Sequence, residues 1–274
     1  MAEDKVKQHY VPCCYLANFG IDGNKKRETE IFAYDSTSFM VRRASVETFA
    51  YSNKFYDLDN PEKQKVLENF FARVEGDYSD ILQQVLVLPR NKTINREQKE
   101  ALAAQFAIQH IRTKAHRDQY WEILKALAQI VPEAKLKHVY KSKKEYLRSL
   151  HVKEIMSFNS IRFFANLLLD RTWIIWRNET GTPFYTSDNP VCTIFHGDPH
   201  SSIAAPDVEI YIPLSPSMAV SAYDKSIIEA DRDRAVAGIC DRRIIDGFNL
   251  YLLPYCTQFV FSNEESFDSY KLKD

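Results

Sequence analysis

The sequence holds 274 residues, of which 45% are hydrophobic and 27% charged, and these proportions are those of an ordinary globular protein. Its 36 basic residues are balanced by 37 acidic ones, which argues against a surface that coats nucleic acid, because such surfaces carry a basic excess. No apolar stretch is long enough to cross a membrane, and the first residues lack the apolar core of a signal peptide. The five cysteines are irregularly spaced and suit a reducing compartment, so we expect a cytoplasmic protein with free thiols and no membrane partner.

Seven glycines and eleven prolines leave little room for long flexible linkers, so we expect a single domain over residues 1–274. The hydrophobic patterns predict an α+β fold with three parts. Residues 1–60 are β-rich and contain a hairpin, residues 61–170 form a central bundle of long helices, and residues 171–274 return to a mostly antiparallel sheet.

The first part is expected to hold a short helix and three strands. Residues 12–19 suit the helix. The strands 30–34 and 39–43 flank the turn-like residues 35–38, and this arrangement predicts a β-hairpin. Residues 54–58 are expected to form the third strand.

The central part begins with a helix over residues 61–87, because apolar side chains recur there at helical spacing after a first-turn proline. A second long helix begins near Asn95, where Gln98 completes a capping box. It continues to residue 131, before Pro132 ends it. Two further helices follow, over residues 133–150 and 153–169.

In the last part, the turn-like residues 178–181 separate two strands, 172–177 and 183–186. Residues 196–207 are expected to form an exposed loop, and part of 226–252 suits a helix. The remaining strand candidates are residues 191–195, 208–212, 218–223 and 258–261.

Two polar segments beside prolines hold candidates for chemistry. His9 lies near Pro12 in a stiff turn, and its imidazole titrates near neutrality, so it can serve as general acid, general base or metal ligand; it can equally fix the chain by hydrogen bonding. Asp188 and Asn189 precede Pro190 at the end of an apolar strand. Such side chains favour a turn in which they bond nearby backbone, although a carboxylate there can also hold a metal or orient a histidine.

The second long helix carries an unusual polar face. Gln105, Gln109 and Arg112 share one side of that helix, and buried amides and guanidinium groups need partners. Arg112 can clamp a carboxylate or a phosphate, but we favour an internal pair with Glu75, which lies near the buried stripe of the preceding helix. Glu68 shares the face of Glu75. Paired carboxylates can hold a metal or act as acid and base, although solvated helix glutamates are commoner.

Several familiar signatures are absent from the sequence. The other histidines and the adjacent Cys13-Cys14 do not have the spacing of a zinc site. There is no P-loop, no Rossmann glycine motif and no nucleophile elbow, which weighs against the common NTPases, nicotinamide enzymes and serine hydrolases. The basic run 135–144 can meet nucleic acid, but a solvated helix face is its first interpretation.

Three short motifs stand out along the chain. They are His9-Tyr10-Val11-Pro12, Ser187-Asp188-Asn189-Pro190-Val191 and Pro213-Leu214-Ser215-Pro216. Together they resemble an uncharacterised bacterial family, a domain of unknown function, over nearly the whole length. The chain departs from that pattern at Cys13-Cys14, where a polar and then an aromatic residue are more usual, and at Lys114, where proline is common. The resemblance implies a shared polar site but supplies no reaction, and a polar network that locks the fold would leave the same pattern. The implied site residues are His9, Glu75, Gln109, Arg112, Asp188 and Asn189.

The mixture of an imidazole, acids, amides and a guanidinium favours a phosphoester hydrolase, a nuclease or a nucleotide-directed enzyme, in a bacterial defence or toxin-like role. In this hypothesis His9 is the general acid or base, and Glu75 with Asp188 orients it or holds Mg²⁺ or Mn²⁺. The substrate-binding residues are Gln109, Arg112 and Asn189. The alternative is a non-catalytic module that binds a small anion or a protein partner, with the polar motifs as a structural network.

Overall fold

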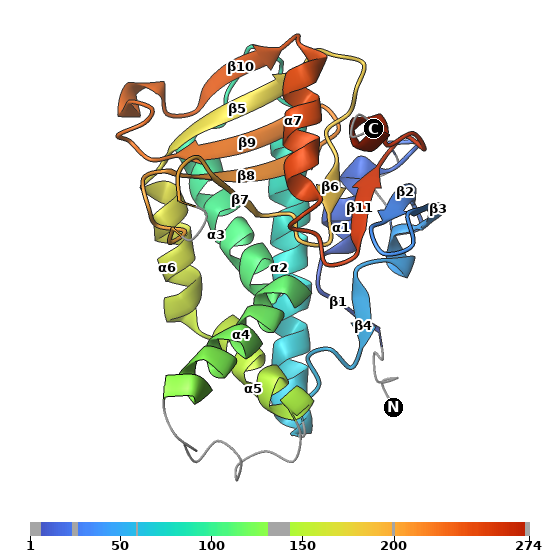
Figure 1. Ribbon diagram of the computed structural model, residues 1–274, viewed down its shortest axis with the longest axis vertical. Helices are drawn as coiled ribbons and strands as arrows, with labels where there is room; N and C mark the ends of the chain where they lie inside the picture. Colours follow the sequence, from blue (N-terminus) through green and yellow to red (C-terminus); the bar gives the residue numbers. More distant parts are fainter. Residues whose placement is uncertain (1–6, 24–26, 59, 131–142, 199–200, 272–274) are drawn as a thin grey trace.

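The computed structural model describes residues 7–23, 27–58, 60–130, 143–198 and 201–271. A run of helices separates two strand-rich parts of the chain, and the predicted α+β fold class is confirmed. Figure 1 shows a sheet layer at one end of the molecule and a bundle of long helices that extends away from it.

The N-terminal part contains the expected hairpin. Its strands β2 (Glu30–Asp35) and β3 (Met40–Ser45) pair antiparallel. The strand β1 (Lys7–His9) precedes them. The expected short helix is present as α1 (Cys13–Leu16), which continues into a 3-10 turn (Ala17–Phe19).

The prediction of a strand over residues 54–58 is wrong. The strand lies earlier, at β4 (Tyr51–Asn53), and pairs antiparallel with β1. Lys54 adopts a left-handed backbone with a φ of 53°, which ends the extended run. The aromatic side chains that suggested a strand, those of Phe55 and Tyr56, are buried in the core instead.

The described part of the chain has five helices in the central bundle. They are α2 (Pro61–Leu86), α3 (Arg96–Arg112), α4 (Lys114–Ile130), α5 (Lys143–Ile155) and α6 (Phe158–Leu169). The capping box of Asn95 and Gln98 at the start of α3 is confirmed. The expected helix over residues 133–150 is seen only from the start of α5, since residues 131–142 lie outside the described residues.

The second long helix does not run unbroken to residue 131. Thr113 has an extended backbone, with φ −71° and ψ 160°, and separates α3 from α4. Its hydroxyl donates to the carbonyl of His110 at 3.1 Å and accepts from the backbone N–H of His116 at 3.2 Å. This threonine therefore ends one helix and caps the next, because its hydroxyl competes for backbone groups.

The main sheet has the strand order β10-β5-β9-β8-β7. Its strands are β5 (Thr172–Asn178), β7 (Cys192–Phe195), β8 (Val208–Ser215), β9 (Met218–Tyr223) and β10 (Ala235–Ile239). Neighbouring strands are antiparallel except β10 with β5, which confirms a mostly antiparallel sheet. The sequence does not predict β10, because alanine and glycine have weak strand propensity.

A second sheet joins the two ends of the chain, in the order β3-β2-β11-β6. Its strand β11 (Phe259–Ser262) pairs antiparallel with β2 and with β6 (Thr186–Ser187). Strand β6 covers only the end of the strand expected over residues 183–186. Helix α7 (Arg242–Leu252) lies within the expected helical segment, and the short helix α8 (Asp268–Lys271) follows β11.

Aromatic stacking holds helices on both faces of the main sheet. On one face, the ring of Phe106 in α3 stacks on Trp173 of β5, with 5.7 Å between ring centroids. On the other face, Phe248 of α7 stacks on Tyr211 of β8 at 4.5 Å. The larger hydrophobic cluster includes side chains from all three parts of the chain. Among the described helices, none is long and apolar enough to cross a membrane.

Candidate functional site

A cavity of about 110 Å³ lies where β1, helix α2 and the last residue of α3 meet. Its walls combine positive, negative, amide and apolar side chains, including Lys7, Gln64 and Leu67. Three of the predicted site residues line it together. These are His9, Glu75 and Arg112.

Arg112 is the last residue of α3 and is only 2% exposed. Its Nη2 donates to the carbonyl of His9 at 2.7 Å and to Oε1 of Glu75 at 3.0 Å, so the predicted ion pair with Glu75 is confirmed. The guanidinium carbon lies 4.5 Å from the ring centre of Phe71, a contact that stabilises the cation. Burial opposes the charge, but Glu75 and Tyr56 hold the pKa of Arg112 above its ordinary value.

These contacts leave part of the guanidinium without partners. The Nε and Nη1 atoms of Arg112 are buried and have no hydrogen-bond acceptor, and an unsatisfied buried donor costs roughly 1–3 kcal/mol. Nη2 belongs to both paired N–H edges of the guanidinium and already donates to His9 and Glu75, so an oxyanion that accepts a pair of N–H groups must share or replace one of these two bonds.

His9 lies in β1 at the edge of the cavity and is half-buried. Its Nε2 lies 3.2 Å from the carbonyl of Glu47, so the neutral ring donates from Nε2 and keeps Nδ1 as its acceptor. Burial lowers the pKa of His9, and the Glu47 carbonyl and the charge of Glu75 oppose this only in part. The imidazole is therefore neutral at pH 7, as a general base must be.

Two glutamates of α2 line the cavity, two helical turns apart. Glu75 pairs with Arg112, and its side chain is still 37% exposed. Glu68 instead accepts from the amide of Gln64 at 3.0 Å. The two carboxylates thus share one cavity and one helix but differ in their contact with the guanidinium.

Gln109 lies next to the site rather than in it. It is 1% exposed, and its Nε2 donates to the carbonyl of Tyr10 at 3.4 Å. Its Oε1 is buried without a partner. Gln109 therefore holds the backbone that follows His9, and it does not line the cavity.

Asp188 and Asn189 do not line the cavity either. The buried Asp188 carboxylate accepts the backbone N–H groups of residues 257–259 at 2.7, 2.9 and 3.2 Å. Burial raises the pKa of Asp188 to about 6, although the three N–H groups lower it. Asn189 donates from Nδ2 to the carbonyl of Tyr255 at 3.1 Å. These contacts fix the entry to β11. They join segments that are distant in the sequence, so they are not the bonds to nearby backbone that the sequence favoured.

The structure does not bring together the two residues expected to hold a metal. Glu75 lines the cavity, whereas the oxygens of Asp188 already accept three backbone N–H groups. Within the described ranges of the chain, no three His, Cys, Asp or Glu side chains converge in a way that could hold a metal ion.

The sequence did not identify Tyr56 and Arg27 as members of this site. The Tyr56 hydroxyl donates to the backbone carbonyl of Arg112 at 2.5 Å, and Arg27 brings a further cation to the cavity. No local pattern links these residues, because the contacts join distant segments. Phe71 could have been identified from the sequence. It precedes Glu75 by four residues on α2, and helical spacing alone places both side chains on one face.

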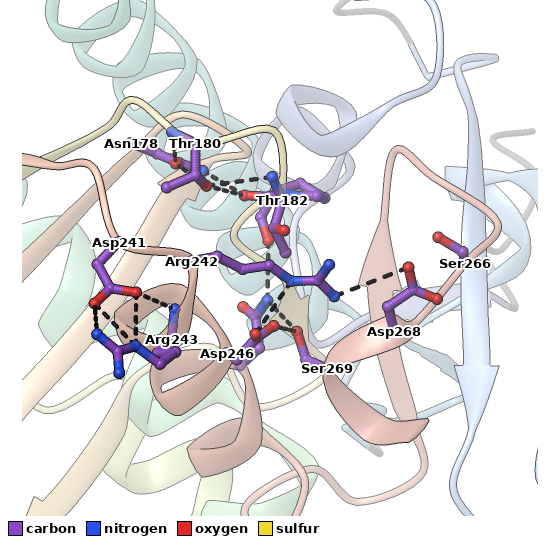
Figure 2. A network of polar contacts seen from close by, with 12 residues as sticks. Asn178, Thr180, Thr182, Asp241, Arg242, Arg243, Asp246, Ser266, Asp268 and Ser269 are labelled. Atoms are coloured by element: carbon purple, nitrogen blue, oxygen red, sulfur yellow. Dashed lines mark hydrogen bonds and ion pairs between the residues drawn. The ribbon is translucent and has the colours of Figure 1, made fainter. Parts of the chain in front are cut away.

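A second polar cluster, which the sequence did not predict, lies around α7 and α8 (Figure 2). A cavity of about 350 Å³ opens beside Arg242. The Nε of Arg242 lies 3.2 Å from Asp246, whose other oxygen accepts the hydroxyl of Ser269 at 2.6 Å. Asn249 donates to the same Ser269 oxygen at 3.1 Å. The cluster therefore ties α8 to α7 through buried hydrogen bonds.

Comparison with known families identifies the family of this chain. A family model described as a protein of unknown function (DUF4238) matches residues 7–266. The chain belongs to this family. No curated protein and no solved structure gives a significant match. The DUF4238 match spans both the cavity residues and the Asp188 turn, and it assigns no reaction.

Proposed function

We propose that the cavity beside His9 and Arg112 binds the anionic end of a small ligand, with phosphoesters as the leading class. The observation that carries this proposal is the Arg112 guanidinium, a buried cation in the wall of the cavity. A planar guanidinium recognises phosphate or carboxylate through paired N–H groups. Lys7 and Arg27 add positive charge at the same cavity.

The size of the cavity limits which part of a ligand enters. Its volume of about 110 Å³ is well below the roughly 300–1,000 Å³ of a site that encloses a whole drug-sized molecule. A phosphate group can enter while the rest of a nucleotide stays outside. The formal charge of −1 agrees with a small ligand or a chain end better than with a long nucleic acid, whose binding depends on many phosphate contacts.

Hydrolysis of that phosphoester is the reaction that we assign to this cavity. His9 is neutral because burial lowers its pKa, so its free ring nitrogen can accept a proton from the water that attacks phosphorus. The ester P–O bond then breaks, and the imidazolium returns the proton to the leaving oxygen. The charge of Glu75 favours the imidazolium that forms in this step. In this proposal Glu75 acts on His9 through its charge alone, because its hydrogen bond goes to Arg112. Asp188 has no part in the reaction, and no step is assigned to a metal. A cytoplasmic role in bacterial defence belongs to the same proposal. The bacterial setting rests on the family resemblance, and the cytoplasmic one rests on the irregularly spaced cysteines.

Binding without turnover is the second candidate. It is favoured by the position of Glu75, which contacts Arg112 at 3.0 Å, whereas the hydrogen bond of His9 goes to a backbone carbonyl. An imidazole without an orienting carboxylate lacks a common feature of catalytic histidines. A module of this kind would hold a small anion, or an acidic group of a protein partner, in the same cavity.

The test is cleavage of labelled RNA, single- and double-stranded DNA and nucleotides by the purified protein, with Mg²⁺, with Mn²⁺ and with chelator. His9→Ala is the site variant. His196→Ala is its matched control, because His196 is exposed and pairs with Glu209 outside the cavity. With both variants melting near the wild-type temperature, we expect His9→Ala to lose roughly 100-fold or more of the turnover and His196→Ala to retain it.

Each other outcome has a defined meaning. Turnover that survives in His9→Ala would remove the catalytic assignment of His9. If no substrate is cleaved, calorimetric titration with inorganic phosphate and nucleoside monophosphates decides between the remaining alternatives. Binding by the wild type that is lost in Arg112→Met supports the non-catalytic module, and an absence of binding by the wild type would overturn the anion site.

A further inference from the structure

The cavity places a carboxylate directly beside its buried cation. Oε1 of Glu75 lies 3.0 Å from Nη2 of Arg112, and both residues line the same space. An oxyanion that binds the guanidinium from the cavity therefore brings one of its oxygens next to the Glu75 carboxylate. Two ionised oxygens repel at that distance, whereas a hydroxyl and a carboxylate form a strong hydrogen bond.

From this arrangement we infer that Glu75 makes the cavity selective for a phosphate group that carries a proton. The P–OH of the ligand donates to Glu75, and its ionised oxygens accept from Arg112. Inorganic phosphate keeps at least one proton at neutral pH, and phosphate monoesters carry one below their second pKa near 6, so both fit this description in weakly acidic solution. Sulfate and ordinary carboxylates are fully ionised there and have no hydrogen to donate. The inference rests on the anion site proposed above and names its substrate class.

The remaining charges of the cavity agree with a singly charged group. Lys7 and Arg27 add positive charge, and Glu68 adds negative charge. Arg27 is already paired with Glu47 at 3.0 Å. Since both signs are present in one small space, a ligand that both accepts and donates hydrogen bonds satisfies more of the lining than a simple anion does.

The chain offers a matched control for this role. Glu68 lies on the same helix, lines the same cavity and has the same charge as Glu75. It bonds to Gln64 and not to Arg112. Glu68→Gln therefore removes an equal charge from the cavity without changing the contact with the guanidinium.

The experiment is calorimetric titration of the full chain with inorganic phosphate and with sulfate, at about pH 6.5, where phosphate is protonated, and at matched ionic strength. We expect the wild type and Glu68→Gln to bind phosphate roughly tenfold or more tightly than sulfate, since the site loses a hydrogen bond with sulfate. In Glu75→Gln the amide can donate to either anion, so we expect the preference for phosphate to disappear.

Failure of this inference is distinguishable from failure of the anion site. If neither anion binds the wild type or either variant, the anion site itself is wrong. Equal affinity of the wild type for phosphate and sulfate would overturn the selectivity and leave the site standing, and so would a preference that persists in Glu75→Gln. The comparison of the two anions on the wild type alone still decides the question if Glu75→Gln does not fold.

Discussion

The Asp188 turn and the His9 cavity each contain a buried charged side chain, and the two differ in how completely that side chain is hydrogen-bonded. The Asp188 carboxylate accepts three backbone N–H groups from residues 257–259. Arg112 donates to Glu75 and to one backbone carbonyl, but two of its nitrogen atoms have no acceptor. Most buried polar groups in folded proteins are satisfied. The Asp188 carboxylate is therefore satisfied within the fold, whereas Arg112 is satisfied only in part, which agrees with the proposed anion site.

The difference has an energetic consequence. A group that satisfies several buried partners stabilises the folded state, and its removal leaves those partners without bonds. A group with unsatisfied donors already costs stability where it stands, as functional residues often do. We therefore expect substitutions of Asp188 and of Arg112 to affect stability very differently, although both side chains are buried and charged.

Asp188→Ala is expected to have the largest effect. It leaves three backbone N–H groups without an acceptor, and we expect the free energy of unfolding to fall by about 4 kcal/mol at neutral pH, since each unsatisfied group costs roughly 1–3 kcal/mol. Urea denaturation measures this loss. Asn189→Ala is the control, because the Asn189 side chain donates one hydrogen bond, to the carbonyl of Tyr255. An Asp188→Ala loss no larger than that of the control would contradict the structural role.

The second prediction concerns the pH dependence of stability. Burial raises the pKa of Asp188 from 3.8 to about 6, so between about pH 4 and pH 6 the folded state holds a proton that the unfolded state has released. Wild-type stability should therefore fall as pH rises through this interval, by about 2–3 kcal/mol relative to Asp188→Asn, which does not titrate. Urea denaturation of both proteins across the interval gives the slope. A slope of the opposite sign would show that the three N–H groups outweigh burial.

Local patterns in the sequence predicted the fold where local forces decide it. Helix α2 and the capping box of α3 depend on side-chain spacing and on bonds within one turn, and both are present as expected. The break at Thr113 depends on whether one hydroxyl bonds to the backbone or to solvent, which spacing does not reveal. The pairing of β11 with β2 joins opposite ends of the chain, so no local window contains it.

The same distinction between local patterns and contacts of distant segments applies to the site, which was predicted only in part. The ion pair of Arg112 with Glu75 followed from two helical faces that each placed a polar group near the core. Grouping Asp188 with His9 rested on motifs, and motifs mark residues that matter to a fold without showing which of them touch. Tyr56 belongs to the site because its buried hydroxyl donates to the backbone carbonyl of Arg112 at the end of α3. This contact depends on the packing of distant segments.

The smallest change in stability is expected for Arg112→Met. The substitution removes the bonds to Glu75 and to the His9 carbonyl, but it also removes two unsatisfied nitrogen atoms, and methionine retains apolar contact with Phe71. Glu75 is not stranded, because its side chain is 37% exposed and water can solvate it. We therefore expect urea denaturation to show a loss below about 1 kcal/mol, far from the roughly 3–5 kcal/mol seen when a buried ion loses its partner, together with loss of phosphate binding. A loss as large as that of Asp188→Ala would show that Arg112 serves the fold, and the observation that carries the anion site would then have a structural explanation.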